Sequence, residues 1–328
     1  MEVKFLTPDM SDAWNKFVEE SPQGSIFCFD WWLDAVTNGD YKICVVVYDD
    51  GTIQSGMVLP FFSTGVIRRP RYSYYQGFLF FNPDNGQNIR LQKYLTTQKE
   101  HTNAILDFIK PYCKNFKFSS HYNYNFWSPL YWRGFEQTTA YTYLIDYTDY
   151  IPEEEFKRFS KGHKWILNKV EKKSDLRVVE GSIEDYLALT KVLCQQKKIS
   201  FDESFLRRLH EVIQNHHSGI IFKIVDSAGN MHAVEYYLYD KNEAYYWSGA
   251  SDIQFRDSGG HTELTWYGIR YFADKVKRFN FCGSMVDAVE KNYRNFSASP
   301  VPYSNIIKLT PIYKIGYNLR EFYRKLKK

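Results

Sequence analysis

The chain has 328 residues, of which 44% are hydrophobic and 24% charged, and its net charge is +4. This length predicts two domains rather than one, and the composition excludes disordered, collagen-like and coiled-coil proteins. A net charge this small does not indicate a DNA-binding protein. The aromatic content of 18% is typical either of a core built from rings or of a cleft that binds sugars or nucleotides.

The cysteines and the apolar runs indicate the cellular compartment of the protein. Five cysteines stand at positions 28, 44, 113, 194 and 282 without C-x-x-C spacing, so neither a disulfide framework nor a zinc site is predicted. The N-terminal sequence MEVKFLTPDMSDAW has no secretory signal pattern. The longest apolar runs reach six residues, whereas a membrane span needs about twenty. We expect a cytoplasmic protein without bound metal, in at most peripheral contact with a membrane.

The two halves of the sequence repeat one pattern. Residues 43–60 and 221–238 each contain a β-rich run, a short turn and a second β-rich run, which is typical of a β-hairpin. Gly51 and Gly229 fall in the two turns, 178 residues apart. Ordered self-similarity of this kind indicates a tandem duplication.

The later parts of the halves continue the repeat. His101 and His261 each open a predicted helix, and a short aromatic strand follows each helix. The further matched segments are Phe116-Lys117-Phe118 with Phe279-Asn280-Phe281, Trp132-Arg133-Gly134-Phe135 with Tyr293-Arg294-Asn295-Phe296, and Tyr141-Thr142-Tyr143-Leu144-Ile145 with Tyr303-Ser304-Asn305-Ile306-Ile307. The prediction is an α/β protein with mixed sheets and two similar domains.

We place the domains at residues 1–150 and 151–312, and the second includes a basic linking helix over 156–173. Residues 313–328 form a separate tail with six basic groups and one acid. In this tail Ile315, Tyr317, Leu319 and Phe322 alternate with the charged residues. The pattern suits a solvated terminal helix or a helix that lies along an anionic surface.

The segment 251–264, SDIQFRDSGGHTEL, follows a predicted strand and opens a helix. Backbone N–H groups at such a helix start bind phosphate. Gly259 and Gly260 would let the backbone approach a pyrophosphate, Arg256 could pair with its charge, and His261 begins the helix. An ordinary glycine-containing turn is the alternative interpretation.

A basic stripe is predicted on the linking helix. Lys157, Lys161, Lys164, Asn168 and Lys172 fall at spacings of three or four residues, which places them on one helical face. Such a stripe suits a phosphorylated substrate or an RNA backbone. A solvated helix face would give the same pattern.

Two residues are candidates for proton transfer. Glu235, in the predicted strand HAVEYYLY, is the acid best placed to accept an amine proton, and Tyr293 could protonate a leaving group. The alternatives are an exposed strand glutamate and a core tyrosine. The patterns H-E-x-x-H, G-x-S-x-G, G-x-G-x-x-G and the P-loop are absent from the sequence.

These segments together resemble the FemAB-like family of the GNAT (N-acyltransferase) superfamily. The matching pieces are Leu59-Pro60-Phe61, Gln76-Gly77, the Trp132 and Tyr141 segments, the Lys161 to Lys173 helix, and the Phe279 and Tyr293 segments. The resemblance covers nearly the whole chain and implies two tandem GNAT-like domains. Where family members have Gly after the last Phe this chain has Ser297, and His261 departs from the GNAT pyrophosphate pattern.

The resemblance implies an acyl- or aminoacyltransferase that acts on an amine of a small molecule or a cell-envelope precursor. The donor would be acyl-CoA or, as in the family members that build peptidoglycan cross-bridges, aminoacyl-tRNA. The chemistry requires removal of the amine proton and stabilisation of an oxyanion. A catalytically silent pair of GNAT domains that only binds ligands is the alternative.

Overall fold

The structure is a computed structural model that describes residues 1–328 except 85–88, 174, 284 and 327–328. The chain divides into two compact units. Unit 1 comprises Met1–Ala140 and Tyr303–Lys328, and unit 2 comprises Tyr141–Pro302. The chain passes from unit 1 to unit 2 within one strand and returns within another, so both predicted boundaries, at 150 and 312, differ from this division.

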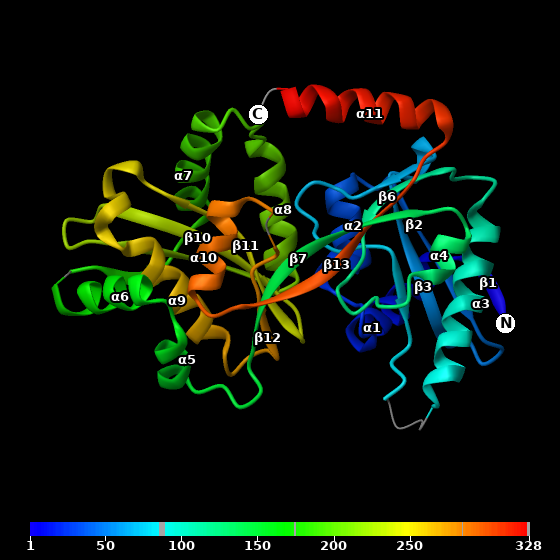
Figure 1. The fold of residues 1–328 in the computed structure, drawn as a ribbon, viewed down its shortest axis with the longest axis horizontal. Coiled ribbons are helices and arrows are strands. Elements are labelled where there is room, and N and C mark those ends of the chain that lie inside the picture. The colour runs from blue at the N-terminus through cyan, green and yellow to red at the C-terminus, as the bar shows by residue number, and fades with distance from the viewer. Residues whose placement is uncertain (85–88, 174, 284, 327–328) are drawn as a thin grey trace. The chain divides into compact units, whose positions relative to one another are not determined.

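Unit 1 contains an antiparallel sheet in the order β1-β2-β3-β5 and a second group of paired strands, β4-β6-β13 (Figure 1). Its core is a cluster of buried residues that includes Met57, Phe78, Ile105 and Phe116. The elements are β1 (Glu2–Phe5), α1 (Ser11–Glu20), α2 (Asp30–Thr37), β2 (Tyr41–Val47), β3 (Ile53–Pro60), β4 (Val66–Arg68), β5 (Phe78–Phe80), α3 (Leu91–Ile109), β6 (Asn115–Ser119), α4 (Ser128–Trp132), β13 (Ser299–Lys308) and α11 (Pro311–Leu326).

Unit 2 contains strands in the order β7-β12-β11-β10-β9-β8, and helix α9 packs on β9 and β10. Only β11 and β12 are parallel among these pairs. The elements are β7 (Glu136–Asp146), α5 (Pro152–Arg158), α6 (Lys161–Lys173), β8 (Arg177–Glu180), α7 (Ile183–Gln196), α8 (Glu203–Asn215), β9 (Gly219–Val225), β10 (Met231–Tyr239), β11 (Glu243–Ser251), the 3-10 helix η4 (Ile253–Ser258), α9 (Gly260–Phe272), β12 (Arg278–Asn280) and α10 (Asp287–Asn295).

The predicted repeat is present in the element order. The hairpin β2-β3 corresponds to β9-β10, and β5, α3, β6, α4 and β7 correspond to β11, α9, β12, α10 and β13. Gly51 and Gly229 occupy the two hairpin turns with φ of 83° and 86°, a backbone region that favours glycine. The last strand of each repeat pairs with the other repeat, since β7 pairs with β12 and β13 pairs with β6 (Figure 1).

The linking helix predicted over 156–173 is wrong as a single element. Helix α5 ends at Arg158, and Phe159 is extended and buried. The Ser160 amide donates to the Asn295 carbonyl at 3.0 Å, and the Ser160 hydroxyl accepts from the His163 amide at 3.2 Å. The second contact satisfies a free amide at the start of α6 as an N-cap does, so the chain turns there and a new helix begins.

Candidate functional site

A carboxyl group is fully buried in the middle of unit 2. Glu235 lies on β10 with an exposed fraction of 0%. The antiparallel register places it opposite Gly249 of β11, and the register shifts by one residue just beyond, between Tyr236 and Tyr237. Bulges of this kind re-aim side chains and are common beside functional sites. A side chain at Gly249 would collide with the Tyr246 hydroxyl, so the glycine leaves room for a ring beside the carboxyl.

Hydroxyl groups from three elements face this carboxyl. Thr265 of α9 donates to Glu235 Oε1 at 2.6 Å, and Tyr237 of β10 donates to Oε2. Burial raises the pKa of Glu235 to about 7, although the hydrogen bonds from Thr265, Tyr237 and Tyr246 favour the ionised form. The group therefore changes charge near neutral pH, as a general base or its partner should.

His261 connects this buried carboxyl with the surface. It precedes Thr265 by one helical turn on α9, so both side chains lie on the same side of the helix. Its Nδ1 is buried, lacks a hydrogen-bond partner among the described residues, and lies 3.3 Å from Glu235 Oε1. The side chain as a whole is 36% exposed. Burial, with a smaller effect of His163, lowers the pKa of His261, so the ring is neutral at pH 7.

Tyr293 lies near this group but within the core. It belongs to α10, is 7% exposed, and stacks on Phe281 with ring centroids 4.6 Å apart. Its ring centroid is 6.3 Å from that of Tyr246. Burial, with smaller contributions from Cys282 and Glu235, raises the pKa of Tyr293 above its usual value. The hydroxyl is therefore a weaker acid than an exposed phenol, and its role in protonating a leaving group stays a prediction.

The glycine loop is packed against the protein. Gly259 has a φ of +87°, and a side chain there would lie 2.8 Å from Ile166 and 2.9 Å from Val170 of α6. The Gly260 amide already donates to the Ser258 hydroxyl at 3.0 Å. Arg256 lies on η4 and is exposed. The two glycines allow close packing at the start of α9 and do not line an open cradle for pyrophosphate, so we derive no step through coenzyme A.

The predicted basic stripe is divided between two helices. Lys157, on α5, pairs with Glu154 at 2.6 Å, and Lys164, on α6, donates to the Lys157 carbonyl at 2.9 Å. Lys161 is exposed at the start of α6. Lys157 also lines a cavity of about 920 Å³ that three glutamates and Arg270 share. The lysines contribute to helix-end and surface contacts, and their role in substrate binding stays a prediction.

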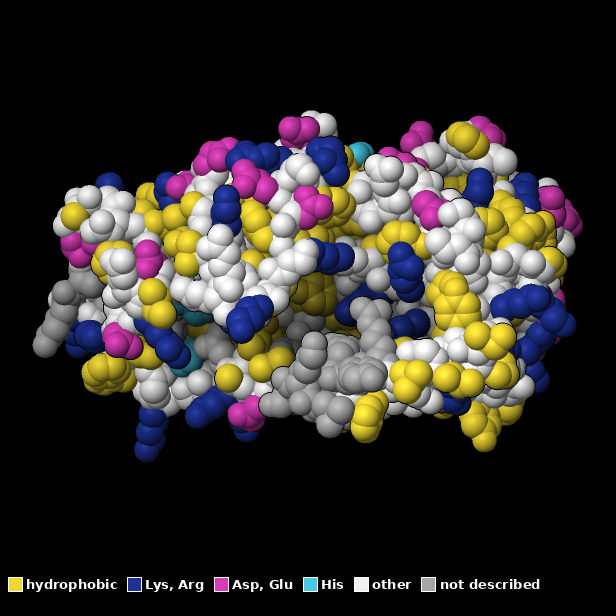
Figure 2. Space-filling model, turned by 90° about the horizontal axis from the view of Figure 1, so that it is seen from above, with side chains coloured by type: hydrophobic (Ala, Val, Ile, Leu, Met, Phe, Trp, Pro, Cys, Tyr) yellow, Lys and Arg dark blue, Asp and Glu magenta, His cyan; other side chains and the backbone are white. Residues whose placement is uncertain are grey.

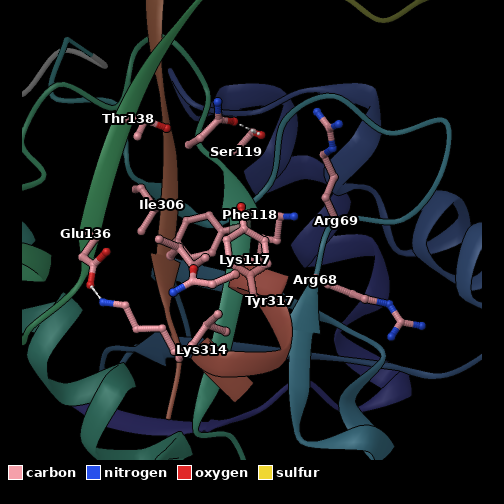
Figure 3. A pocket seen from close by; sticks show the side chains of 14 residues that line it. Arg68, Arg69, Lys117, Phe118, Ser119, Glu136, Thr138, Ile306, Lys314 and Tyr317 are labelled. Carbon is pink, nitrogen blue, oxygen red and sulfur yellow. Dashed lines mark hydrogen bonds and ion pairs between the residues drawn. The ribbon is translucent and has the colours of Figure 1, made fainter. Parts of the chain in front are cut away.

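Unit 1 contains a cationic pocket that the sequence analysis missed. It measures about 560 Å³ and lies between β4, β6, β13 and α11 (Figure 3). Four basic residues and one acid line it, namely Arg68, Arg69, Lys117, Lys314 and Glu136. Lys314 pairs with Glu136, and Lys117 Nζ lies 4.6 Å from the centroid of the Tyr317 ring. The excess of positive charge suits an anionic ligand.

The residues that complete the two sites left different signals in the sequence. Tyr237 follows Glu235 by two positions and Thr265 follows His261 by four, so strand and helix periodicity could have found both. Arg68 and Arg69 stand in the run RRPRY, which is visible in the sequence. The glycine–carboxyl pairing of Gly249 and Glu235 depends on strand register, which no local pattern reveals.

Comparison with known proteins identifies the fold. It is similar to that of FemX, with a TM-score of 0.70 and 13% identity over 96% of this chain and 99% of FemX. A tandem GNAT protein from the clavulanic acid biosynthesis pathway gives 0.53 and 11% over 94% and 98% of the two chains. L-PGS from Bacillus licheniformis gives 0.50 and 13% over 94% and 95%. No protein family model and no curated protein matches the sequence.

The likeness to these structures covers both repeats. The chain has a tandem GNAT fold, which confirms the α/β class and the duplication predicted from the sequence. Within that class its arrangement is similar to that of FemX. In the part of the chain that the structure describes, no helix could cross a membrane and no group of three or more His, Cys, Asp or Glu side chains could hold a metal ion.

Proposed function

We propose that this protein is an acyl- or aminoacyltransferase that forms an amide on an amine acceptor, and that Glu235 and His261 of unit 2 remove the amine proton. The observation that carries the proposal is the buried Glu235 carboxyl, whose pKa is about 7, beside a partly exposed imidazole. The FemAB-like resemblance and the tandem GNAT fold support this class of reaction. The acceptor would be a small molecule or a cell-envelope precursor.

The proposed step uses each nitrogen of His261 differently. The acceptor amine attacks the carbonyl carbon of the donor, the C–N bond forms, and the bond to the leaving thiol or hydroxyl breaks. The amine proton passes to His261 Nε2 and from there to the departing thiolate or alkoxide, which leaves as the thiol or alcohol, while Nδ1–H faces Glu235 Oε1. This tautomer requires Glu235 to be ionised, because a protonated carboxyl would hold Nδ1 as an acceptor and put the proton on Nε2. Glu235 is then a positioning residue, because its exposed fraction of 0% keeps it from the substrate.

The charge state of Glu235 gives the proposed reaction a pH dependence. The titratable groups that face the pair are Tyr237, Tyr246, Tyr293 and His163. The tyrosines that show a shift have raised pKa values, and burial lowers the pKa of His163. The pKa values of Tyr237, Tyr293 and His163 all move away from neutral pH in this way, whereas the pKa of Glu235 lies at about 7. The rate should therefore rise with pH through about 7.

The test is amide formation from a panel of acyl-CoAs and aminoacyl-tRNAs with amine acceptors, followed by mass spectrometry. Glu235→Gln should lower the rate at pH 8 by about 100-fold, the lower end of the contribution of general base catalysis, and should remove the rise near pH 7. Glu263→Gln is the matched control, since it changes a glutamate of α9 that pairs with Arg270. Equal pH profiles for wild type and Glu235→Gln would exclude the proposed pair.

The donor requires a separate test. If the 256–261 loop binds acyl-CoA, Arg256→Ala should weaken that binding by about 1.5–3 kcal/mol, the range for a hydrogen bond to a charged group. Isothermal titration calorimetry of wild type and variant measures the difference. Failure of wild type to bind any acyl-CoA would exclude this donor and direct the search to aminoacyl-tRNA.

The alternative function is a catalytically silent pair of GNAT domains that binds an anionic ligand. The cationic pocket of unit 1 supports it, because that pocket has the charge for binding and lacks a carboxyl–imidazole pair among its lining residues. A thermal-shift panel of acyl-CoAs, nucleotide-sugar precursors and tRNA discriminates the two functions. Stabilisation by an anionic ligand without any transfer product would favour the binding module.

A further inference from the structure

Helix α11 contacts unit 1 through polar groups. Its first turn follows Thr310, whose amide donates to Asn115 Oδ1 at 2.8 Å. Lys314 pairs with Glu136, and Tyr317 lies under the Lys117 ammonium group, all around the cationic pocket (Figure 3). A helix on a globular protein ordinarily turns its apolar stripe to the core. Here the side that faces the protein is the polar one.

The apolar stripe of α11 lies on the surface instead. Ile312, Ile315, Leu319 and Phe322 have exposed fractions of 84%, 64%, 55% and 58%. Their spacing of three, four and three residues puts them on one face of the helix. Figure 2 views the molecule from the side on which α11 lies in Figure 1, and hydrophobic side chains are exposed on this face. A continuous exposed apolar stripe marks a surface that binds another molecule or a membrane.

The sequence of the same helix is strongly basic. Residues 313–328 contain six lysines and arginines and one glutamate. This excess of charge would make two copies of the helix repel each other, and it favours an anionic surface. Amphipathic helices with basic and apolar residues bind in the plane of such a surface, with the apolar face in the boundary between headgroups and acyl chains.

We propose that α11 docks this protein on an anionic lipid surface. Ile312, Ile315, Leu319 and Phe322 enter the boundary region, and the net positive charge of residues 313–328 attracts the helix to the lipid phosphates. The binding is peripheral and reversible, since one helix supplies it. It is independent of the transfer reaction, because none of these residues belongs to the Glu235 and His261 group.

The test is flotation of the full chain with lipid vesicles. Wild type should bind vesicles of phosphatidylcholine mixed with phosphatidylglycerol, and should bind phosphatidylcholine alone at least about tenfold more weakly. Added salt should weaken the first interaction. The double variant Ile315→Ser with Leu319→Ser should lower the partition to anionic vesicles by at least about tenfold. Both substitutions remove apolar groups that would be buried in the lipid.

A matched variant controls for general loss of hydrophobicity. Val192→Ser with Ile199→Ser changes two exposed aliphatic residues of unit 2, 47% and 52% exposed, and should bind anionic vesicles as wild type does. Thermal melting of all variants checks that they fold. Absence of wild-type binding to anionic vesicles would overturn the proposal. A wild-type dimer that the α11 double variant dissociates would overturn it too, since a second copy would then cover the stripe.

Discussion

The two repeats place different chemistry at equivalent positions. In unit 2 Glu235 lies opposite Gly249, and Thr265 donates to its carboxyl. With the offsets of the hairpin turns and of the two helix histidines, 178 and 160 residues, the corresponding residues of unit 1 are Met57 and Ile105. Both are fully buried members of the apolar core. At these two positions one copy of the fold has apolar side chains, whereas the other buries a carboxyl group and a hydroxyl group that donates to it.

The residues that lie near Glu235 in unit 2 and near Met57 in unit 1 also differ. Met57 lies opposite Phe78, a bulky residue, whereas Glu235 lies opposite Gly249. The histidines differ in exposure as well. His101 is 1% exposed, and its Nδ1 lies 3.0 Å from the Ser55 hydroxyl, whereas His261 is partly exposed beside Glu235. The comparison indicates that the duplication kept the scaffold in both halves and that unit 2 has a buried carboxyl beside its histidine, where unit 1 has Met57 and a histidine beside Ser55.

The largest expected effect comes from exchanging the central residues. Met57→Glu should destabilise the protein by about 4 kcal/mol or more at pH 8, because Met57 is fully buried in an apolar cluster and lies opposite the Phe78 ring. Glu235→Met should lower the free energy of unfolding by less than half as much at pH 8, since it replaces a buried charge with an apolar side chain. Chemical denaturation of both variants measures the two changes in the free energy of unfolding. Equal costs would contradict the distinction between the two centres.

The second prediction concerns stability and pH. The pKa of Glu235 is raised in the folded protein from 4.5 to about 7. The folded state therefore binds the proton more tightly, and the corresponding stabilisation is complete below pH 4.5 and is lost as the pH rises through 7. Wild type should lose about 3 kcal/mol relative to Glu235→Gln across this window. Denaturation series from pH 4 to pH 8 give the difference, and parallel curves would show that Glu235 has an ordinary pKa.

The third prediction separates a hydrogen bond from packing. Thr265→Val removes one donor to the carboxylate, so it should cost about 1–2 kcal/mol at pH 8 and raise the pKa of Glu235 further. Ile105→Val, the matched change in unit 1, should cost about 1 kcal/mol with no dependence on pH. The pH at which activity rises would move upward only in Thr265→Val. An unchanged pH profile would mean that Thr265 does not influence the carboxyl.

The smallest effect is expected at the divided basic stripe. Changing Lys157, Lys161 and Lys164 to Gln should alter stability by a few tenths of a kcal/mol each. If these lysines contact a phosphorylated acceptor or tRNA, affinity should fall and its salt dependence should become shallower. Salt titrations with the ligand found in the thermal-shift panel distinguish the cases. Identical slopes for wild type and the triple variant would leave the lysines as surface residues.

The sequence predicts the order of elements better than their partners. Gly51 and Gly229 mark equivalent turns because a short hairpin requires a positive φ there, and this requirement is local. The break at Phe159 depends on a contact between Ser160 and Asn295, which lie far apart in the sequence, so helical periodicity predicts one helix where there are two. Glu235 is recognisable as an acid in a strand, but its burial and its pKa depend on β11 and α9.

The exchange of last strands has a consequence for how the protein is made. Strand β6 obtains one of its neighbours only from β13, at residues 305–308, and unit 1 also includes α11. During synthesis on the ribosome the first domain therefore keeps an open strand edge until residues 305–308 have emerged. Unit 2 needs only residues 141–302 and can be completed earlier, so the half that begins first is the one that finishes folding last.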